Sequence, residues 1–213
     1  MRPSLSFLVV AVFCLAPAAR AGDGLVADPE TILQTYIEAM GGRDAILAVE
    51  TRHYRGRRVD DLGYKDPPVT ETVLEIWATA GGEILVKETA AGEEPVVRDL
   101  AGSVDKLGWL LHPHGPLLVG AYFPDLVVKE QAHRNGRWVN VLESPGLDGT
   151  SWSLAFDVGT GLLNHIGYYW DLLDYRPEGD VNFAHTIITS RKGGSSTFFF
   201  EEIETNGKRP EGF

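Results

Sequence analysis

His112 and His114 are the two residues whose spacing most suggests metal chemistry. Residues two apart on a strand point to the same face, and imidazole is a common ligand of zinc. Pro113 interrupts a regular strand between them, and the spacing identifies no third ligand. We therefore keep a metal site at His112 and His114 only as an alternative to two loop histidines, and we expect no cofactor.

The stretch Gly159-Thr160-Gly161 invites comparison with a phosphate-binding loop. Such a loop needs either a lysine followed by Ser or Thr, or a third glycine that opens a helix. Leu162 and Leu163 follow instead, and the flanking residues have the composition of strands, so the helix N-terminus that would hold a phosphate is missing. We predict a hairpin turn with a glycine in the left-handed region.

The remaining polar residues form no catalytic set that the sequence can identify. No G-x-S-x-G motif is present, and Cys14 falls in the apolar N-terminal stretch, so we predict a protein without catalysis. The paired acids are typical of solvated edges and turns. A small hydrolase remains an alternative, and it would use the scattered histidines His53, His133, His165 and His185.

Aromatic side chains give a more informative pattern. Trp152, Leu154 and Phe156 are spaced two apart, so they share one face of a strand, opposite Ser151, Ser153 and Asp157. A curled sheet that leaves its interior unfilled would form an apolar cavity from such rings, whereas an ordinary core is the alternative for each single residue. The further candidates for the lining of a lipid-binding cavity are Trp77, Trp109, Trp138, Tyr168, Trp170, Phe198 and Phe200.

The first 21 residues have the pattern of a secretory signal peptide. Arg2 supplies the positive start, an apolar run extends from Leu5 to Ala16, and cleavage is expected between Ala21 and Gly22. The run is shorter than the roughly 20 residues that a membrane-spanning helix needs, so we expect an exported protein, soluble after cleavage. A lipid anchor on Cys14 is the alternative, disfavoured by the bulky residue before it.

Composition limits the possible partners. The chain carries 30 acidic and 19 basic residues and a net charge of −11, which repels nucleic acid and anionic membranes. No linker or internal repeat divides residues 22–213, which suit one domain. We expect a monomer.

Hydrophobic periodicity predicts one clear helix near the N-terminus. Asp28 can cap it, Pro29 occupies a tolerated first position, and Gly41-Gly42 ends it after an apolar stripe. A short helical turn is expected over 43–50. The rest is mainly strand, with segments expected at 51–59, 70–80, 83–90, 95–101, 107–112, 137–144, 150–157, 162–176, 181–191 and 196–205.

The connections between these strands are short and rich in turn residues, which favours hairpins and an antiparallel sheet. Residues 115–127 break the rhythm and fit either a short helix or a long loop across the sheet. We therefore predict a mainly β protein with few helices (α+β). Its single curved antiparallel sheet forms an incomplete β-barrel, with an N-terminal helix and a mid-chain helical plug.

Three segments resemble the outer-membrane lipoprotein-sorting proteins of the LolA/LolB-like superfamily. "YIEAMGGRDAILAVETRHYRGR" is similar to the opening of that family, "FDVGTGLLNHI" to one of its hairpins, and "DYRPEGDVNFAHTI" with "FEEIETN" to its closing strands. The resemblance covers roughly residues 29–56 and 137–206, whereas residues 57–136 match poorly.

The resemblance implies a hydrophobic interior that accepts acyl chains and transport through the periplasm without catalysis. The hypothesis is a periplasmic binding or carrier protein for a lipid, another hydrophobic small molecule or the acyl chains of lipoproteins. The alternative is an envelope interaction or stress-sensor module that binds a protein partner with the same fold.

Overall fold

The computed structural model describes residues 27–63, 66, 69–100, 106–145, 150–167 and 169–213. The predicted signal peptide 1–21, its cleavage point between Ala21 and Gly22, and Tyr168 lie outside the described residues. Within the described ranges, no helix is both long and apolar enough to cross a membrane.

The N-terminal helix forms as its sequence predicts. Helix α1 spans Pro29–Ala39, and the Asp28 carboxylate accepts a 2.9 Å hydrogen bond from the backbone N–H of Thr31. The chain then turns at Gly41, whose φ of 117° is accessible to glycine and to few other residues. The short predicted turn follows as helix α2, Arg43–Leu47.

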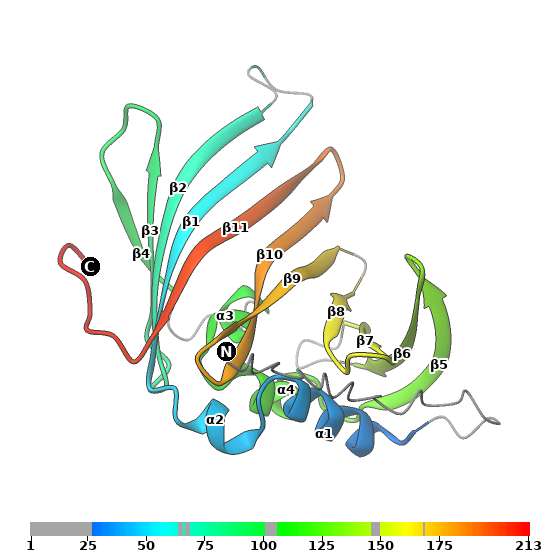
Figure 1. Ribbon diagram of the computed structural model, residues 1–213. Helices are drawn as coiled ribbons and strands as arrows, with labels where there is room; N and C mark the ends of the chain where they lie inside the picture. The colour runs from blue at the N-terminus through cyan, green and yellow to red at the C-terminus, as the bar shows by residue number, and fades with distance from the viewer. Residues whose placement is uncertain (1–26, 64–65, 67–68, 101–105, 146–149, 168) are drawn as a thin grey trace, which may run out of the picture.

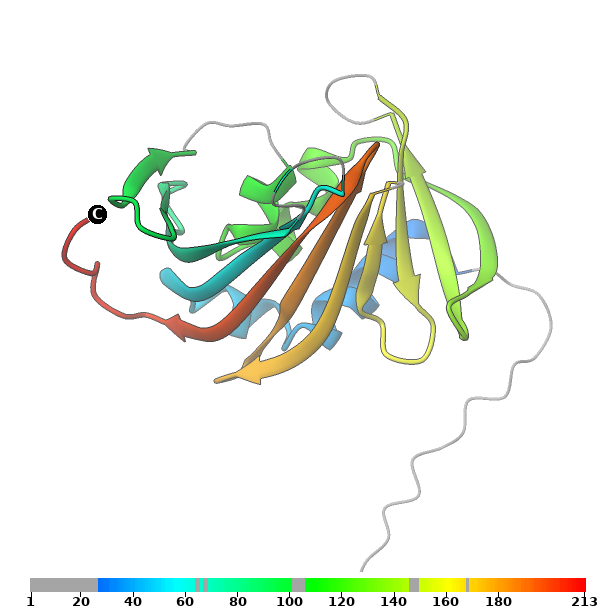
Figure 2. The same ribbon diagram turned by 90° about the horizontal axis from the view of Figure 1, so that it is seen from above.

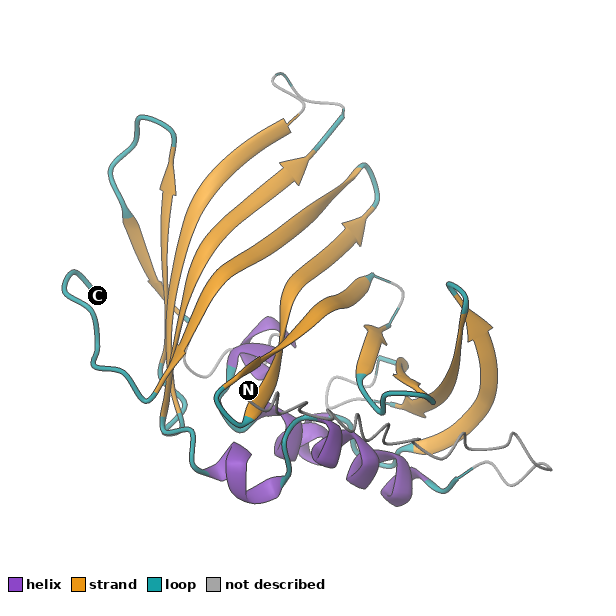
Figure 3. Cartoon of the chain, in the orientation of Figure 1, coloured by secondary structure: helices purple, strands orange, loops and turns teal. Residues whose placement is uncertain are grey.

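The described residues contain eleven strands in one antiparallel sheet, which curves without closing into a barrel (Figures 1 and 3). This confirms the predicted fold class. The strands are β1 Thr51–Asp61, β2 Val69–Thr79, β3 Ile84–Ala90, β4 Val96–Asp99, β5 Val127–Arg134, β6 Arg137–Ser144, β7 Trp152–Asp157, β8 Leu163–Ile166, β9 Trp170–Glu178, β10 Val181–Arg191 and β11 Gly194–Thr205.

The order of the strands explains the mid-chain helical segment. The sheet runs β4-β3-β2-β1-β11-β10-β9-β8-β7-β6-β5, so β4 and β5 lie at its opposite edges although they follow each other in the chain. The connection between them contains α3 (Lys106–Leu111), η1 (Gly115–Leu118) and α4 (Val119–Tyr122). It crosses the concave face of the sheet, and all the described helices lie on that side (Figure 2).

A β-bulge bends the centre of the sheet. The register between β1 and β11 shifts between Arg55 and Gly56, which places an extra residue in β11. Gly56 is required there because a Cβ would lie 1.8 Å from the carbonyl oxygen of Phe199. The bend helps the sheet to wrap around the helical segment.

Two sequence-based predictions of strands are wrong in the segments next to the crossing. Residues 107–112 form helix α3, because a chain that crosses the face of a sheet has no neighbouring strand to pair with. The segment 162–176 is two strands, β8 and β9, separated at Gly167 with φ of 62°. Strand β5 was not predicted, because it is an edge strand and most of its side chains are polar and exposed.

The Gly159-Thr160-Gly161 stretch is the predicted hairpin turn, between β7 and β8. The Asp157 carboxylate accepts hydrogen bonds from the backbone N–H groups of Gly159 (2.8 Å) and Thr160 (2.7 Å). Gly161 has φ of 75° and lies against Thr35 of α1. The turn amides are therefore occupied by a carboxylate of the protein itself, which would repel a phosphate.

Candidate functional site

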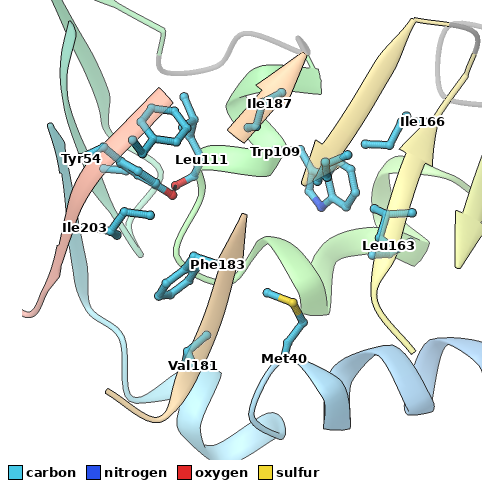
Figure 4. Close-up of a cluster of buried hydrophobic side chains, with 14 of the residues drawn as sticks. Met40, Tyr54, Trp109, Leu111, Leu163, Ile166, Val181, Phe183, Ile187 and Ile203 are labelled. Carbon is cyan, nitrogen blue, oxygen red and sulfur yellow. Dashed lines mark hydrogen bonds between the residues drawn. The ribbon is translucent and has the colours of Figure 1, made fainter. Parts of the chain in front are cut away.

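The main hydrophobic core joins the helices to the sheet (Figure 4). Helix α1 contributes Tyr36, Met40 follows directly after that helix, and helix α3 contributes Trp109 and Leu111. Each of these four residues is at most 4% exposed. Inside this core lies a cavity of only about 40 Å³. Its lining comes from seven elements and from Met40, which follows α1: Tyr36, Met40, Arg52, Tyr54, Trp109, Leu110, Leu111, Gly115, Pro116, Leu172, Tyr175, Phe183, Ala184, Ile187 and Phe200.

The crossing segment, which we define as residues 106–122, fills the concave side with Trp109. The Trp109 indole N–H donates a 2.6 Å hydrogen bond to the carbonyl of Gly115, and its ring meets that of Phe123 edge-on at 5.2 Å. A Cβ on Gly115 would lie 2.5 Å from the carbonyl oxygen of Trp109, so only glycine allows this close turn. The crossing segment thus folds around its own tryptophan.

Arg52 of β1 connects the sheet to the crossing segment. Its guanidinium donates from Nη1 to the Tyr54 hydroxyl (2.6 Å) and from Nη2 to the carbonyl of Pro113 (2.7 Å). The Phe183 ring covers the guanidinium, with the Cζ atom 3.9 Å from the ring centroid, which is cation–π geometry. Arg52 is 2% exposed, and its Nε has no hydrogen-bond partner.

Tyr54 completes this connection. Its hydroxyl accepts from Arg52 and donates a 3.2 Å hydrogen bond to the carbonyl of Leu111. Burial raises the pKa of the Tyr54 hydroxyl, and the nearby charge of Arg52 only partly opposes this, so Tyr54 stays neutral and keeps its proton to donate. Two backbone carbonyls of the crossing segment are therefore held by two side chains of one strand.

His112 and His114 flank the carbonyl that Arg52 holds. The Nδ1 atom of His112 accepts a 3.0 Å hydrogen bond from the backbone N–H of His114, and the two rings lie 5.8 Å apart. Burial lowers the pKa of His112, and the charges of His114 and Arg52 lower it further. The described residues provide no third His, Cys, Asp or Glu to complete a metal-binding group with this pair.

Most of the predicted cavity residues lie in or against the main core, and two of them, Trp77 and Trp138, do not. Trp109 and Phe200 line the cavity, and the same core contains or contacts the predicted residues Trp152, Leu154, Phe156, Trp170 and Phe198. Trp138 is 57% exposed near the tip of the β5–β6 hairpin. Tyr168 lies outside the described residues.

Trp77 lies on the opposite face of the sheet. Its neighbours Ile76 and Ala78 belong to the main core, and side chains alternate along a strand. Trp77 instead meets the His53 ring edge-on with the ring centroids 6.3 Å apart, and Phe213 of the C-terminal segment meets the same ring at 6.3 Å.

A larger hollow of about 870 Å³ lies on the helix-free face, between β9 and the β5–β6 hairpin. The apolar part of its lining consists of Val139, Ala155, Leu162, Leu172, Leu173 and Tyr175. The rest of its lining is polar: His133, Arg134, Asn135, Arg137, Asn164, His165, Asp171 and Asp174. A ligand there would lie against these eight polar side chains, whereas the core beneath the crossing segment is almost wholly apolar, so that core is the better candidate for a hydrophobic ligand.

Arg52 is the central residue that the sequence did not identify. Four arginines occur between positions 52 and 58, at both alternations of the strand, so no local signal distinguishes the buried one. The spacing of Arg52 and Tyr54, two apart and on one face, is the one usable indication.

No protein-family model matches the sequence, and no curated protein matches it. Several solved structures share its fold. A DUF1329 family protein from Desulfovibrio piger superposes with a TM-score of 0.58 at 10% identity, over 87% of this chain and 96% of that chain. A LolA superfamily protein from Nitrosomonas europaea gives a TM-score of 0.58 at 8% identity, over 86% of this chain and 96% of that chain.

A third similar structure, from Vibrio parahaemolyticus, is a domain assigned to outer-membrane lipoprotein sorting. It gives a TM-score of 0.51 at 11% identity, over 84% of this chain and 95% of that chain. The superpositions establish the fold. At identities this low they do not establish the function, which has to be argued from the site. The predicted resemblance is confirmed at that level: the chain has the open, curved-sheet fold of the LolA superfamily.

Proposed function

We propose that this protein is a periplasmic carrier that binds a lipid, or the acyl chains of a lipoprotein, between its crossing segment and its sheet, without catalysis. The observation that carries the proposal is an apolar core closed by a segment that two polar side chains, Arg52 and Tyr54, connect to the sheet. The cleavable signal predicted at residues 1–21 supports export, and we propose that the exported protein acts as a soluble monomer.

The closed form leaves no room for a ligand. Pockets that hold small molecules have volumes of about 300–1,000 Å³, and the cavity here has about 40 Å³. Binding therefore requires the crossing segment to move away from the sheet. That movement breaks the hydrogen bonds to Pro113 and Leu111 and exposes the apolar residues that surround Trp109.

Burial of an acyl chain and removal of the crossing segment from the core involve free energies of comparable size. Burial of 15 methylenes of an acyl chain contributes about 12 kcal/mol, at about 0.8 kcal/mol each. Removal of four apolar side chains from the core costs about 6–12 kcal/mol on the same scale. They are Trp109, Leu111 and Val119 of the crossing segment and Phe123, which directly follows it. An acyl chain of about twelve carbons or more, which contributes about 9 kcal/mol or more, can thus replace the segment, whereas a much shorter chain cannot.

A substitution that fills the cavity tests the site. Ala184 lines the cavity, so Ala184→Leu should weaken binding of a dansyl-labelled fatty acid to the delipidated protein. Ala132→Leu is the matched control, because Ala132 packs on the small cluster of the helix-free face. Equal affinities of the two variants would place the ligand elsewhere.

Native mass spectrometry of protein purified from the periplasm tests the function itself. We expect a co-purified lipid and saturable binding of the labelled fatty acid. A protein that carries no lipid and shows no saturable binding would not be a carrier. Crosslinking to another envelope protein in intact cells would then favour the interaction module.

A further inference from the structure

Arg52 differs from the other arginines of its strand in its surroundings. Arg55 pairs with Glu202, Arg57 with Glu71, and Arg58 with Asp60 and Glu88. Arg52 is the most buried of the four, and among the described residues no carboxylate forms an ion pair with it. A buried charge without a counter-ion costs free energy. The absence of a carboxylate beside Arg52 is therefore notable in a protein with 30 acidic residues.

One edge of the Arg52 guanidinium has an N–H group without a hydrogen-bond partner. A guanidinium has five N–H groups. Nη1 donates to Tyr54, Nη2 donates to a backbone carbonyl of the crossing segment, and Nε has no partner. The Nε and Nη2 groups form the edge that holds a carboxylate or phosphate with two parallel hydrogen bonds.

The movement that admits a ligand also frees this edge. When the crossing segment leaves the sheet, Nη2 loses the carbonyl of Pro113, and Nε is already available. Arg52 lines the cavity, and so does Tyr36. Burial raises the pKa of the Tyr36 hydroxyl, and the charge of Arg52 only partly opposes this, so the phenol stays neutral. An anion at this point would meet a buried cation and a neutral phenol.

We infer that Arg52 binds the anionic headgroup, a carboxylate or a phosphate, of an amphiphile whose chain takes the place of the crossing segment. This inference rests on the proposed function and adds the class of ligand to it. The headgroup replaces the carbonyl of Pro113, so ligand binding and closure of the segment exclude each other at one guanidinium edge. Because the site is buried, salt should weaken the binding little.

Three twelve-carbon ligands test the inference: dodecanoate, dodecyl phosphate and dodecanol. Their affinities are measured by displacement of the neutral apolar probe N-phenyl-1-naphthylamine from the delipidated protein. We expect at least one of the two anions to bind roughly ten- to hundred-fold more tightly than the alcohol. This is the gain in affinity that a charge-assisted hydrogen-bonded pair typically gives. The relative affinities of the two anions distinguish a fatty acid from a phosphate headgroup.

The variant Arg52→Gln separates headgroup binding from closure of the segment. It should lower the affinity for the anions to that for dodecanol and leave dodecanol bound as tightly as before or more tightly. Arg57→Gln, on the same strand but 39% exposed, is the matched control and should preserve the preference.

Two outcomes would overturn the inference while the carrier function stands. One is a wild-type protein that binds dodecanol as tightly as both anions, a result that needs no variant. The other is an Arg52→Gln variant in which the affinities for all three ligands change by the same factor. Failure of all three ligands to bind wild-type protein would instead contradict the proposed function.

Discussion

The Nη2 atom of Arg52 donates a 2.7 Å hydrogen bond to the carbonyl of Pro113, which connects the first strand to a segment 61 residues further along the chain. The hydrogen bond reaches the turn between α3 and η1, the middle of the segment that crosses the concave face. It lies beside His112 and His114 and near Tyr54. Changes to these side chains should therefore alter both stability and access to the core.

Tyr54→Phe should destabilise the protein by about 1–3 kcal/mol, because it leaves an N–H of Arg52 and the carbonyl of Leu111 without a partner. Urea unfolding should show a lower midpoint with an unchanged m-value. Tyr122→Phe is the control, since the Tyr122 hydroxyl makes no hydrogen bond within the described part of the chain. Equal midpoints for the two variants would show that the Tyr54 hydroxyl does not hold the segment.

Acidification should loosen the crossing segment through His112. The folded protein lowers the pKa of His112 below 6.5, so the unfolded chain binds more protons as the pH falls below that value. Stability from this group is complete well above pH 6.5 and is lost as the pH falls through 6.5 toward the folded pKa. Urea unfolding of wild type at pH 7.5 and at pH 5.5 measures the difference.

His112→Asn should reduce that pH dependence, because asparagine can still accept the hydrogen bond from the backbone N–H of His114 without binding a proton. His133→Asn changes an exposed histidine and should leave the difference as in wild type. If both variants kept the full pH dependence, another group would be responsible.

Asp157→Ala should unfold the β7–β8 hairpin more easily. Burial alone would raise the pKa of Asp157. Hydrogen bonds outweigh this effect and lower the pKa below its usual value, and their donors are Thr160, the Arg137 guanidinium and the N–H of Gly159. Loss of these bonds should cost about 1–2 kcal/mol. The measurement is the urea midpoint, with the exposed Asp66→Ala as the reference, and a midpoint equal to that of the reference would contradict the expected role.

The features that the sequence predicted are those that neighbouring residues determine. Helix α1 follows from its cap at Asp28, its apolar stripe and its glycine stop, and the turn at Gly159 to Gly161 follows from its composition. The prediction of a strand where helix α3 forms was wrong. The conformation of this segment depends on β4 and β5 lying at opposite edges of the sheet, which no local pattern shows. The burial of Arg52 depends on the same crossing, so a local pattern does not predict it.

The turn of the crossing segment offers a test of whether its packing closes the core. In Gly115→Ala the new methyl group would meet the carbonyl oxygen of Trp109 at 2.5 Å, so the turn must open and the indole hydrogen bond to residue 115 must lengthen. We expect a loss of about 1–3 kcal/mol, the usual cost of overpacking, together with tighter binding of N-phenyl-1-naphthylamine.

Gly120→Ala is the matched control for this change, because a Cβ at Gly120 meets nothing within 4 Å. Alanine in helix α4 should stabilise the protein by up to about 1 kcal/mol, since glycine is the poorer helix former. The two glycines lie in the same segment, so opposite shifts in the urea midpoint would trace the effect to the turn around Trp109. If Gly115→Ala lowered the midpoint without any gain in probe binding, the turn would stabilise the fold without controlling access to the core.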